Sequence, residues 1–178
     1  MFRNRWKRIA AVVVVVGALA APASAAENAS RRVTAADPLE RSVLLEVNAL
    51  RARHRLAPLR LSDRLTAAAD AHSDAMARRG FFAHESADGS AFWKRVRRFY
   101  GDRGFGYWSV GENLLWSSPN IDAAGALQMW LDSPPHRKNL LKPEWREIGL
   151  SALHVPSAPG VYNGLEVTIV TADFGIRK

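Results

Sequence analysis

Two histidines and one glutamate of this 178-residue chain are its main candidates for proton transfer or metal binding. They are His84, Glu112 in Gly111-Glu112-Asn113, and His136 directly after a Pro-Pro pair. Separations of 28 and 24 residues mean that no single element carries all three, unlike an HExxH helix that brings its own ligands. Any shared site must therefore be assembled by the tertiary fold.

Such a set supports more than one kind of chemistry. Neutral imidazoles and a carboxylate bind a borderline cation such as zinc and leave a position open for water. Alternatively, Glu112 is a general base and the imidazoles carry protons, which requires that burial raise the pKa of Glu112. In the structural alternative, Glu112 accepts hydrogen bonds from backbone amides, and His136 with Arg137 anchors the chain. The sequence does not fix a cofactor, and zinc is the candidate.

The first 25 residues are typical of an export signal. Four basic residues precede an apolar run over 9–21, and Ala23-Ser24-Ala25 is a small-residue cleavage site. This run of 13 residues is shorter than the roughly 20 needed to cross a bilayer. We expect a secreted protein with no transmembrane span in the mature chain, located in the medium or the cell envelope, and an uncleaved anchor is the alternative. Residues 26–36 lack periodicity and predict a flexible leader.

Composition excludes several classes of function. The chain has no cysteine, which rules out disulfides, thiolate metal sites and a cysteine nucleophile. Four of its 25 basic residues lie in the signal, which has no acid, so 21 bases against 17 acids remain. A net charge of +4 is an ordinary solubilising value and gives no reason to expect nucleic-acid binding. Nucleotide-binding and serine-hydrolase motifs are lacking.

Hydrophobic periodicity predicts one α+β domain over 37–178, which we expect to be a monomer. Turn and capping signals divide this domain into helices and strands. Helices are expected over 37–55, 62–80, a short segment after Ser90, and 121–131, and strands over 110–116, 147–155 and 165–174. The last two strands predict an antiparallel hairpin with a long loop.

Three residues on the predicted helices favour structural roles. His72 lies on the apolar face of the second helix, which predicts a buried core histidine outside the site. Asn48 and Arg51 are three residues apart on the first helix and are expected to tie it to a neighbouring loop. Most of the five tryptophans after the signal are expected in the core, with one or two lining the cleft.

The short helix after Ser90 is amphipathic and basic. Its basic residues are Lys94, Arg95, Arg97 and Arg98. Such a face fits an anionic envelope polymer or a lipid surface, although basic faces are often simply solvated.

Several motifs occur in an order known from one family. They are Asn48-Ala49-Leu50-Arg51, residues 72–76, Phe82-Ala83-His84, Gly111-Glu112-Asn113, Trp130 with residues 133–139, Ile148-Gly149 and Asp173-Phe174-Gly175. Over about residues 40–175 the chain resembles the CAP superfamily, in the bacterial, cysteine-free branch of secreted SCP-like proteins. This resemblance implies an α-β-α sandwich, in which a small, mainly antiparallel sheet lies between helical layers. It also implies an open cleft with two histidines and two acids.

The resemblance assigns three of these four cleft residues. The two histidines match His84 and His136, and the acid of the Gly-Glu-Asn motif matches Glu112. The second acid, about ten residues after the first histidine in relatives that have it, has no counterpart, because Arg95 stands there.

The resemblance leaves three hypotheses for function. We favour a module that binds a lipid, an envelope component or a protein partner, because some members of the family do so. The alternative is a metal-assisted peptidase or wall-modifying hydrolase, in which the two histidines hold a cation and Glu112 orients water. The third is a structural protein with an inert cleft.

Overall fold

The computed structural model describes residues 38–178 of the chain. The expected export signal and leader therefore lie outside the described residues. In chain order the elements are α2 (Pro38–Arg53), β1 (Arg60–Leu61), α3 (Asp63–Arg79), α4 (Phe92–Phe99), β2 (Trp108–Ser117), α5 (Ala123–Asp132), α6 (Pro134–Leu140), β3 (Glu147–Val155), a 3-10 turn (Gly160–Tyr162) and β4 (Val167–Arg177).

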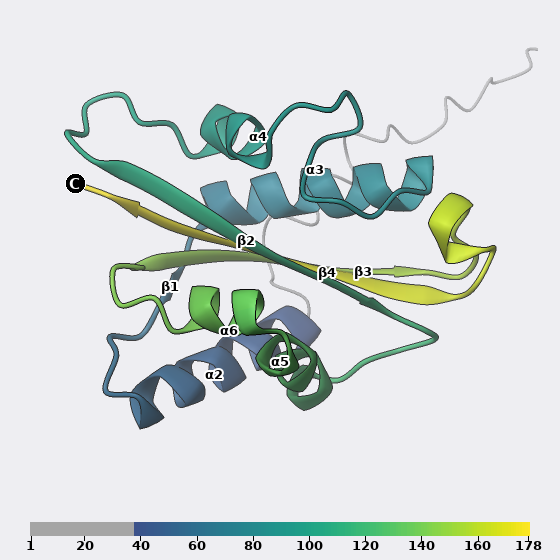
Figure 1. Ribbon diagram of the computed structural model, residues 1–178, viewed down its shortest axis with the longest axis horizontal. Helices are drawn as coiled ribbons and strands as arrows, with labels where there is room; N and C mark the ends of the chain where they lie inside the picture. The colour runs from purple at the N-terminus through teal and green to yellow at the C-terminus, as the bar shows by residue number, and fades with distance from the viewer. Residues whose placement is uncertain (1–37) are drawn as a thin grey trace, which may run out of the picture. The chain divides into compact units, whose positions relative to one another are not determined.

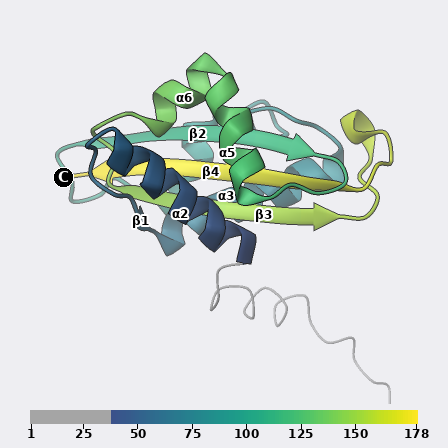
Figure 2. The same cartoon turned by 90° about the horizontal axis from the view of Figure 1, so that it is seen from below.

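The strands form one sheet between two layers of helices. Their order is β1-β3-β4-β2, with β4 antiparallel to both of its neighbours and the short β1 parallel to β3. Helices α3 and α4 cover one face, and α2, α5 and α6 cover the other (Figures 1 and 2). The predicted α+β class and the α-β-α sandwich are thus confirmed, as is the antiparallel pairing of β3 with β4.

The central strand β4 explains the β-branched run near the C-terminus. Every residue from Val167 to Ile176 is buried, because helices pack on both faces of the sheet and strands flank it on both sides. On one of these faces α3 approaches β3 so closely that a Cβ at Gly149 would overlap the backbone of Leu65 and Thr66. The Ile148-Gly149 motif therefore reflects close packing of a helix on the sheet.

The helix ends follow the signals in the sequence. Gly80 ends α3 in the left-handed conformation, with φ 66°, and its N–H donates to the carbonyl of Met76. Asn48 exchanges two hydrogen bonds with the backbone of Leu59, of 3.0 and 2.7 Å. The buried Arg51 donates to the carbonyls of Ala57 and Leu140 at 2.9 and 2.8 Å. The expected role of Asn48 and Arg51 in tying α2 to neighbouring loops is confirmed.

Two features differ from the sequence-based expectation. No helix was expected over 134–140, directly after the predicted helix 121–131. Instead Pro134 and Pro135 occupy the first positions of α6, where a missing N–H costs nothing and the fixed φ suits a helix. Of the five tryptophans only Trp130 and Trp145 are fully buried, while Trp93 is 39% exposed.

Within residues 38–178, no helix is both long and apolar enough to cross a membrane.

Candidate functional site: a cleft at the edge strand

The three predicted site residues come from three elements and line one cavity. His84 lies in the loop between α3 and α4, Glu112 on the edge strand β2, and His136 in the first turn of α6. Helices α4 and α6 cover opposite faces of the sheet (Figure 1). This cavity takes its lining from the edge strand β2, from α6 with the residues after it, and from the loop before α4. Its volume is about 450 Å³, and its lining also includes Asn113, Pro135, Lys138, Asn139 and Lys142.

Glu112 is held on both sides by other residues. Its side chain has no exposed surface. The Nδ1–H of His84 donates to Oε1 of Glu112 at 2.8 Å, and Arg95 forms an ion pair with Oε2. The hydrogen bond to Glu112 raises the pKa of His84 above its usual range. Both oxygens of this carboxylate are therefore engaged within the protein.

Arg95 corrects the view of α4 as a uniformly exposed basic face. Its side chain is only 7% exposed, and it also donates to the carbonyl of His84 at 3.3 Å. Arg95 is spaced three and four residues from Phe92 and Phe99, so the periodicity already placed it on the apolar side of the helix. Arg95, at the position where the resemblance led us to expect a second acid, therefore pairs with Glu112.

Asp173 is a site residue that the sequence analysis did not assign. It is the cross-strand partner of Glu112 on β4 and is fully buried. Burial, and then the charge of Glu112, raise the pKa of Asp173 well above its usual range. As acceptors, its oxygens have no hydrogen-bond partner among the described residues. The raised pKa favours the protonated carboxyl, which carries an O–H donor. The signal in the sequence was an acid inside an apolar, β-branched strand.

Asparagines tie α6 to β2 and so position His136. Asn113 donates to the carbonyl of His136 at 3.1 Å and accepts from Asn139 at 3.0 Å. A Cβ at Gly111 would lie 2.6 Å from Oδ1 of Asn139. The glycine of the Gly-Glu-Asn motif therefore leaves room for the Asn139 side chain that donates to Asn113. Burial lowers the pKa of His136, and His84 lowers it further, which favours a neutral imidazole.

His72 is confirmed as a core residue that supports the cleft indirectly. It is 1% exposed, and its Nε2 lies 2.8 Å from the carbonyl of Ala83. Because Ala83 precedes His84, this contact holds the loop that carries His84. Burial lowers the pKa of His72.

The donors at the cleft do not form a ready-made metal site. Across the described part of the chain, no three His, Cys, Asp or Glu side chains are arranged to hold one ion. With Glu112 engaged by His84 and Arg95, the open donors at the cleft are imidazole nitrogens. Zinc binding by His84, Glu112 and His136 stays a prediction. No tryptophan is among the residues lining this cavity, contrary to the expectation.

The comparison with known families agrees with the fold and the motifs. Residues 44–174 match CAP, the cysteine-rich secretory protein family. Since this match covers most of the chain, the chain belongs to the CAP family. It does so without any cysteine, so the name of the family does not describe its composition.

Two similar proteins come from Bacillus species. The chain is similar to YkwD of Bacillus subtilis strain 168, an uncharacterized protein, with 29% identity over 111 residues, which are 62% of this chain and 41% of YkwD. An extracellular protein containing an SCP domain from Bacillus anthracis has 31% identity and a TM-score of 0.59, over 78% of this chain and 40% of that one. The chain spans about two fifths of the curated relatives it matches.

A more distant structure shows the fold alone. An outer surface protein from Borrelia burgdorferi has a TM-score of 0.61 at 21% identity, over 78% of this chain and 92% of that protein. The same architecture therefore persists where little of the sequence is shared.

Proposed function

We propose that this chain is a secreted bacterial CAP protein whose cleft binds an anionic component of the cell envelope, such as a lipid or wall fragment bearing phosphate or carboxylate. The predicted export signal supports secretion, and the similar Bacillus anthracis protein is an extracellular one. Binding is a more suitable role than catalysis for this cleft because its acid is already neutralised by neighbours.

The observation that carries this proposal is the state of Glu112. With that carboxylate buried and paired to His84 and Arg95, the ionisable groups left to face a ligand are imidazoles and ammonium groups. They belong to His84, His136, Lys138 and Lys142. The raised pKa of His84 keeps its imidazole positive to higher pH than usual. A ligand with negatively charged oxygens therefore matches the cleft.

The test is a titration of the purified protein with two probes, a short-chain phosphatidylglycerol and a muropeptide. We expect the side-chain NMR signals of His84 and His136 to shift and saturate with at least one probe. Lys138→Gln/Lys142→Gln should weaken binding about tenfold, since a charge-assisted hydrogen bond contributes about 1.5–3 kcal/mol. Lys94→Gln/Lys178→Gln removes the same charge outside the cleft and should leave affinity unchanged. If neither probe moves either signal, the proposal fails.

A metal-assisted hydrolase is the second candidate, and the orientation of His84 favours it. Glu112 holds Nδ1, while Nε2 of His84 has no hydrogen-bond partner in the described residues. A carboxylate that orients a histidine in this way is common behind metal-binding imidazoles. His136, with its lowered pKa, lines the same cavity. Here Glu112 orients a ligand and is not the third ligand itself.

Zinc content distinguishes the second candidate from the first. Stoichiometric zinc that is lost in His84→Ala/His136→Ala, together with loss of peptide or wall-fragment cleavage, would support the hydrolase. Equal zinc content and equal cleavage in both proteins would exclude it and leave ligand binding as the function of the cleft.

A further inference from the structure

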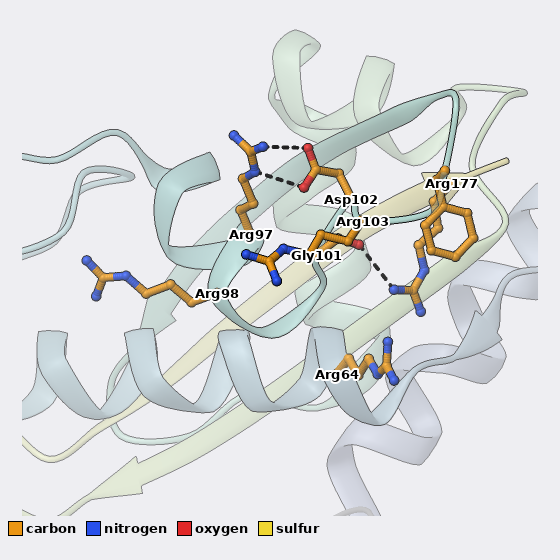
Figure 3. Close-up of a pocket in the computed structure, with 8 residues that line it drawn as sticks. Arg64, Arg97, Arg98, Gly101, Asp102, Arg103 and Arg177 are labelled. Carbon is orange, nitrogen blue, oxygen red and sulfur yellow. Dashed lines mark hydrogen bonds and ion pairs between the residues drawn. The ribbon is translucent and has the colours of Figure 1, made fainter.

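A second cavity, of about 550 Å³, lies on the sheet face covered by α3 and α4. Its lining is rich in arginine and includes one acid, Asp102. The arginines are Arg64 of α3, Arg97 and Arg98 of α4, Arg103 of the following loop and Arg177 of β4 (Figure 3). We call this the arginine cavity. It shares no lining residue with the cleft of His84 and Glu112.

Two of these arginines are held in place by the fold. Arg177 lies over the ring of Tyr100, with Cζ 4.0 Å from the centroid, and 4.9 Å from that of Phe105. It also donates to the carbonyl of Gly101 at 3.3 Å. Arg97 makes a bidentate pair with Asp102, at 3.1 and 2.6 Å. Part of the positive lining is therefore ordered before any ligand arrives, which reduces the entropic cost of binding.

The other three arginines are open to a ligand. Within residues 38–178, Arg64, Arg98 and Arg103 form no ion pair and no side-chain hydrogen bond, and all three are exposed. Asp102, which is half-buried and already paired with Arg97, lies near Arg103, and the exposed Asp88 lies near Arg98, but neither of these two contacts is an ion pair. Five arginines against one lining acid give the cavity a charge of about +4. Like charges gathered in this way repel one another, so a multivalent anion would stabilise the folded chain.

The chemistry and the distribution of these groups define the ligand. A guanidinium presents a planar fork that binds phosphate oxygens in pairs. In Figure 3 the arginine side chains come from different elements and point in different directions, without converging on one point. A ligand with several phosphate groups along a chain would contact more of them than a single phosphate could.

We propose that the arginine cavity binds a water-soluble envelope polymer with repeated phosphodiester groups. A polymer chain can enter a hollow, whereas a flat bilayer surface cannot follow one. Phe105, the aromatic residue that lines the cavity, has Cζ of Arg177 4.9 Å from the centroid of its ring, so one face of this ring is already covered. This site is separate from the proposed function of the cleft.

The test measures binding of a synthetic glycerol-phosphate oligomer to the purified chain by titration calorimetry at several salt concentrations. Arg64→Gln/Arg98→Gln should weaken binding at least about tenfold. It should also reduce the slope of log K against log salt by roughly two, because fewer counterions are released when two cations are removed. The matched control is Arg53→Gln/Arg79→Gln, which removes two exposed arginines at the ends of α2 and α3. It should change the affinity less than twofold.

Four further outcomes would overturn the proposal. In the first, the oligomer does not bind. In the second, the two arginine variants lose the same affinity for the oligomer, and in the third, inorganic phosphate binds as tightly as the oligomer. In the fourth, phosphatidylglycerol vesicles or a charge-matched oligothymidylate bind more tightly than the oligomer. Lys138→Gln/Lys142→Gln separates this proposal from that of the cleft. This lysine variant should bind the oligomer as tightly as the unmodified chain. If it loses oligomer binding while Arg64→Gln/Arg98→Gln keeps it, the polymer binds in the cleft instead.

Discussion

Arg95 and Glu112 form a buried ion pair that joins α4 to the edge strand β2. Their side chains are 7% and 0% exposed, and Asp173 lies opposite Glu112 on β4. One guanidinium thus faces two carboxyl groups in the interior. The residues behind the cleft are therefore charged groups that must neutralise one another in the folded protein, whether or not a ligand is bound.

Removing the cation from this centre should destabilise the protein strongly. We expect Arg95→Gln to lower the free energy of unfolding by about 3–5 kcal/mol, because it leaves a buried carboxylate without its partner. Urea denaturation measures this change. The control is Arg97→Gln, since Arg97 also lies on α4 but pairs with Asp102 at the surface. Its loss should have a much smaller effect on stability. Equal losses in the two variants would show that burial of the Arg95 pair has no special importance.

Asp173 should make stability depend on pH. Its folded-state pKa is raised, so the folded protein holds a proton that the unfolded chain releases near pH 3.9. Stability should therefore decline as pH rises from about 4 through the raised pKa. Asp173→Asn should flatten this decline and increase stability at neutral pH. Unfolding free energies at pH 4.5, 6 and 7.5 test this, and parallel pH profiles for the two proteins would contradict it.

The two cleft histidines should titrate on opposite sides of the usual value of about 6.5. The hydrogen bond to Glu112 raises the pKa of His84, whereas burial lowers that of His136. The stabilising contribution of the His84 contact is complete below about pH 6.5 and is lost as pH rises through the raised pKa. NMR titration of the imidazole signals reads both values. In Glu112→Gln the pKa of His84 should fall, and an unchanged value would refute the assigned cause.

The close approach of α3 to β3 should make any side chain at Gly149 destabilising. A Cβ at Gly149 would overlap the backbone of Leu65 and Thr66, so we expect Gly149→Ala to cost roughly 3 kcal/mol through overpacking. Gly106→Ala is the matched control, because the nearest atom to its added Cβ would be the carbonyl oxygen of Lys178 at 4.0 Å. Thermal unfolding compares the two. A stable Gly149→Ala protein would mean that α3 can shift away from the sheet.

Local signals in the sequence predicted most of the elements. The strand over 147–155 has the observed bounds, and Gly80 ends its helix as expected. Periodicity works here because the buried face of each element repeats along the chain. The helix that begins with Pro134 was missed, since a proline pair indicates a break as readily as it indicates a helix start. The two-residue β1 was also missed, because so short a strand has no period.

Residue types and family motifs in the sequence indicated that two imidazoles and one carboxylate, of His84, His136 and Glu112, were the candidates for chemistry and share a cleft. Only the tertiary structure decided what that carboxylate contacts. Arg95 and Asp173 lie 17 and 61 residues from Glu112 in the chain, and they meet it because α4 packs over the sheet and β4 pairs with β2. Hydrophobic patterns report which side of an element is buried, but a buried charge acquires its partner through long-range packing. The same packing gathers arginines from α3, α4 and β4 into one cavity.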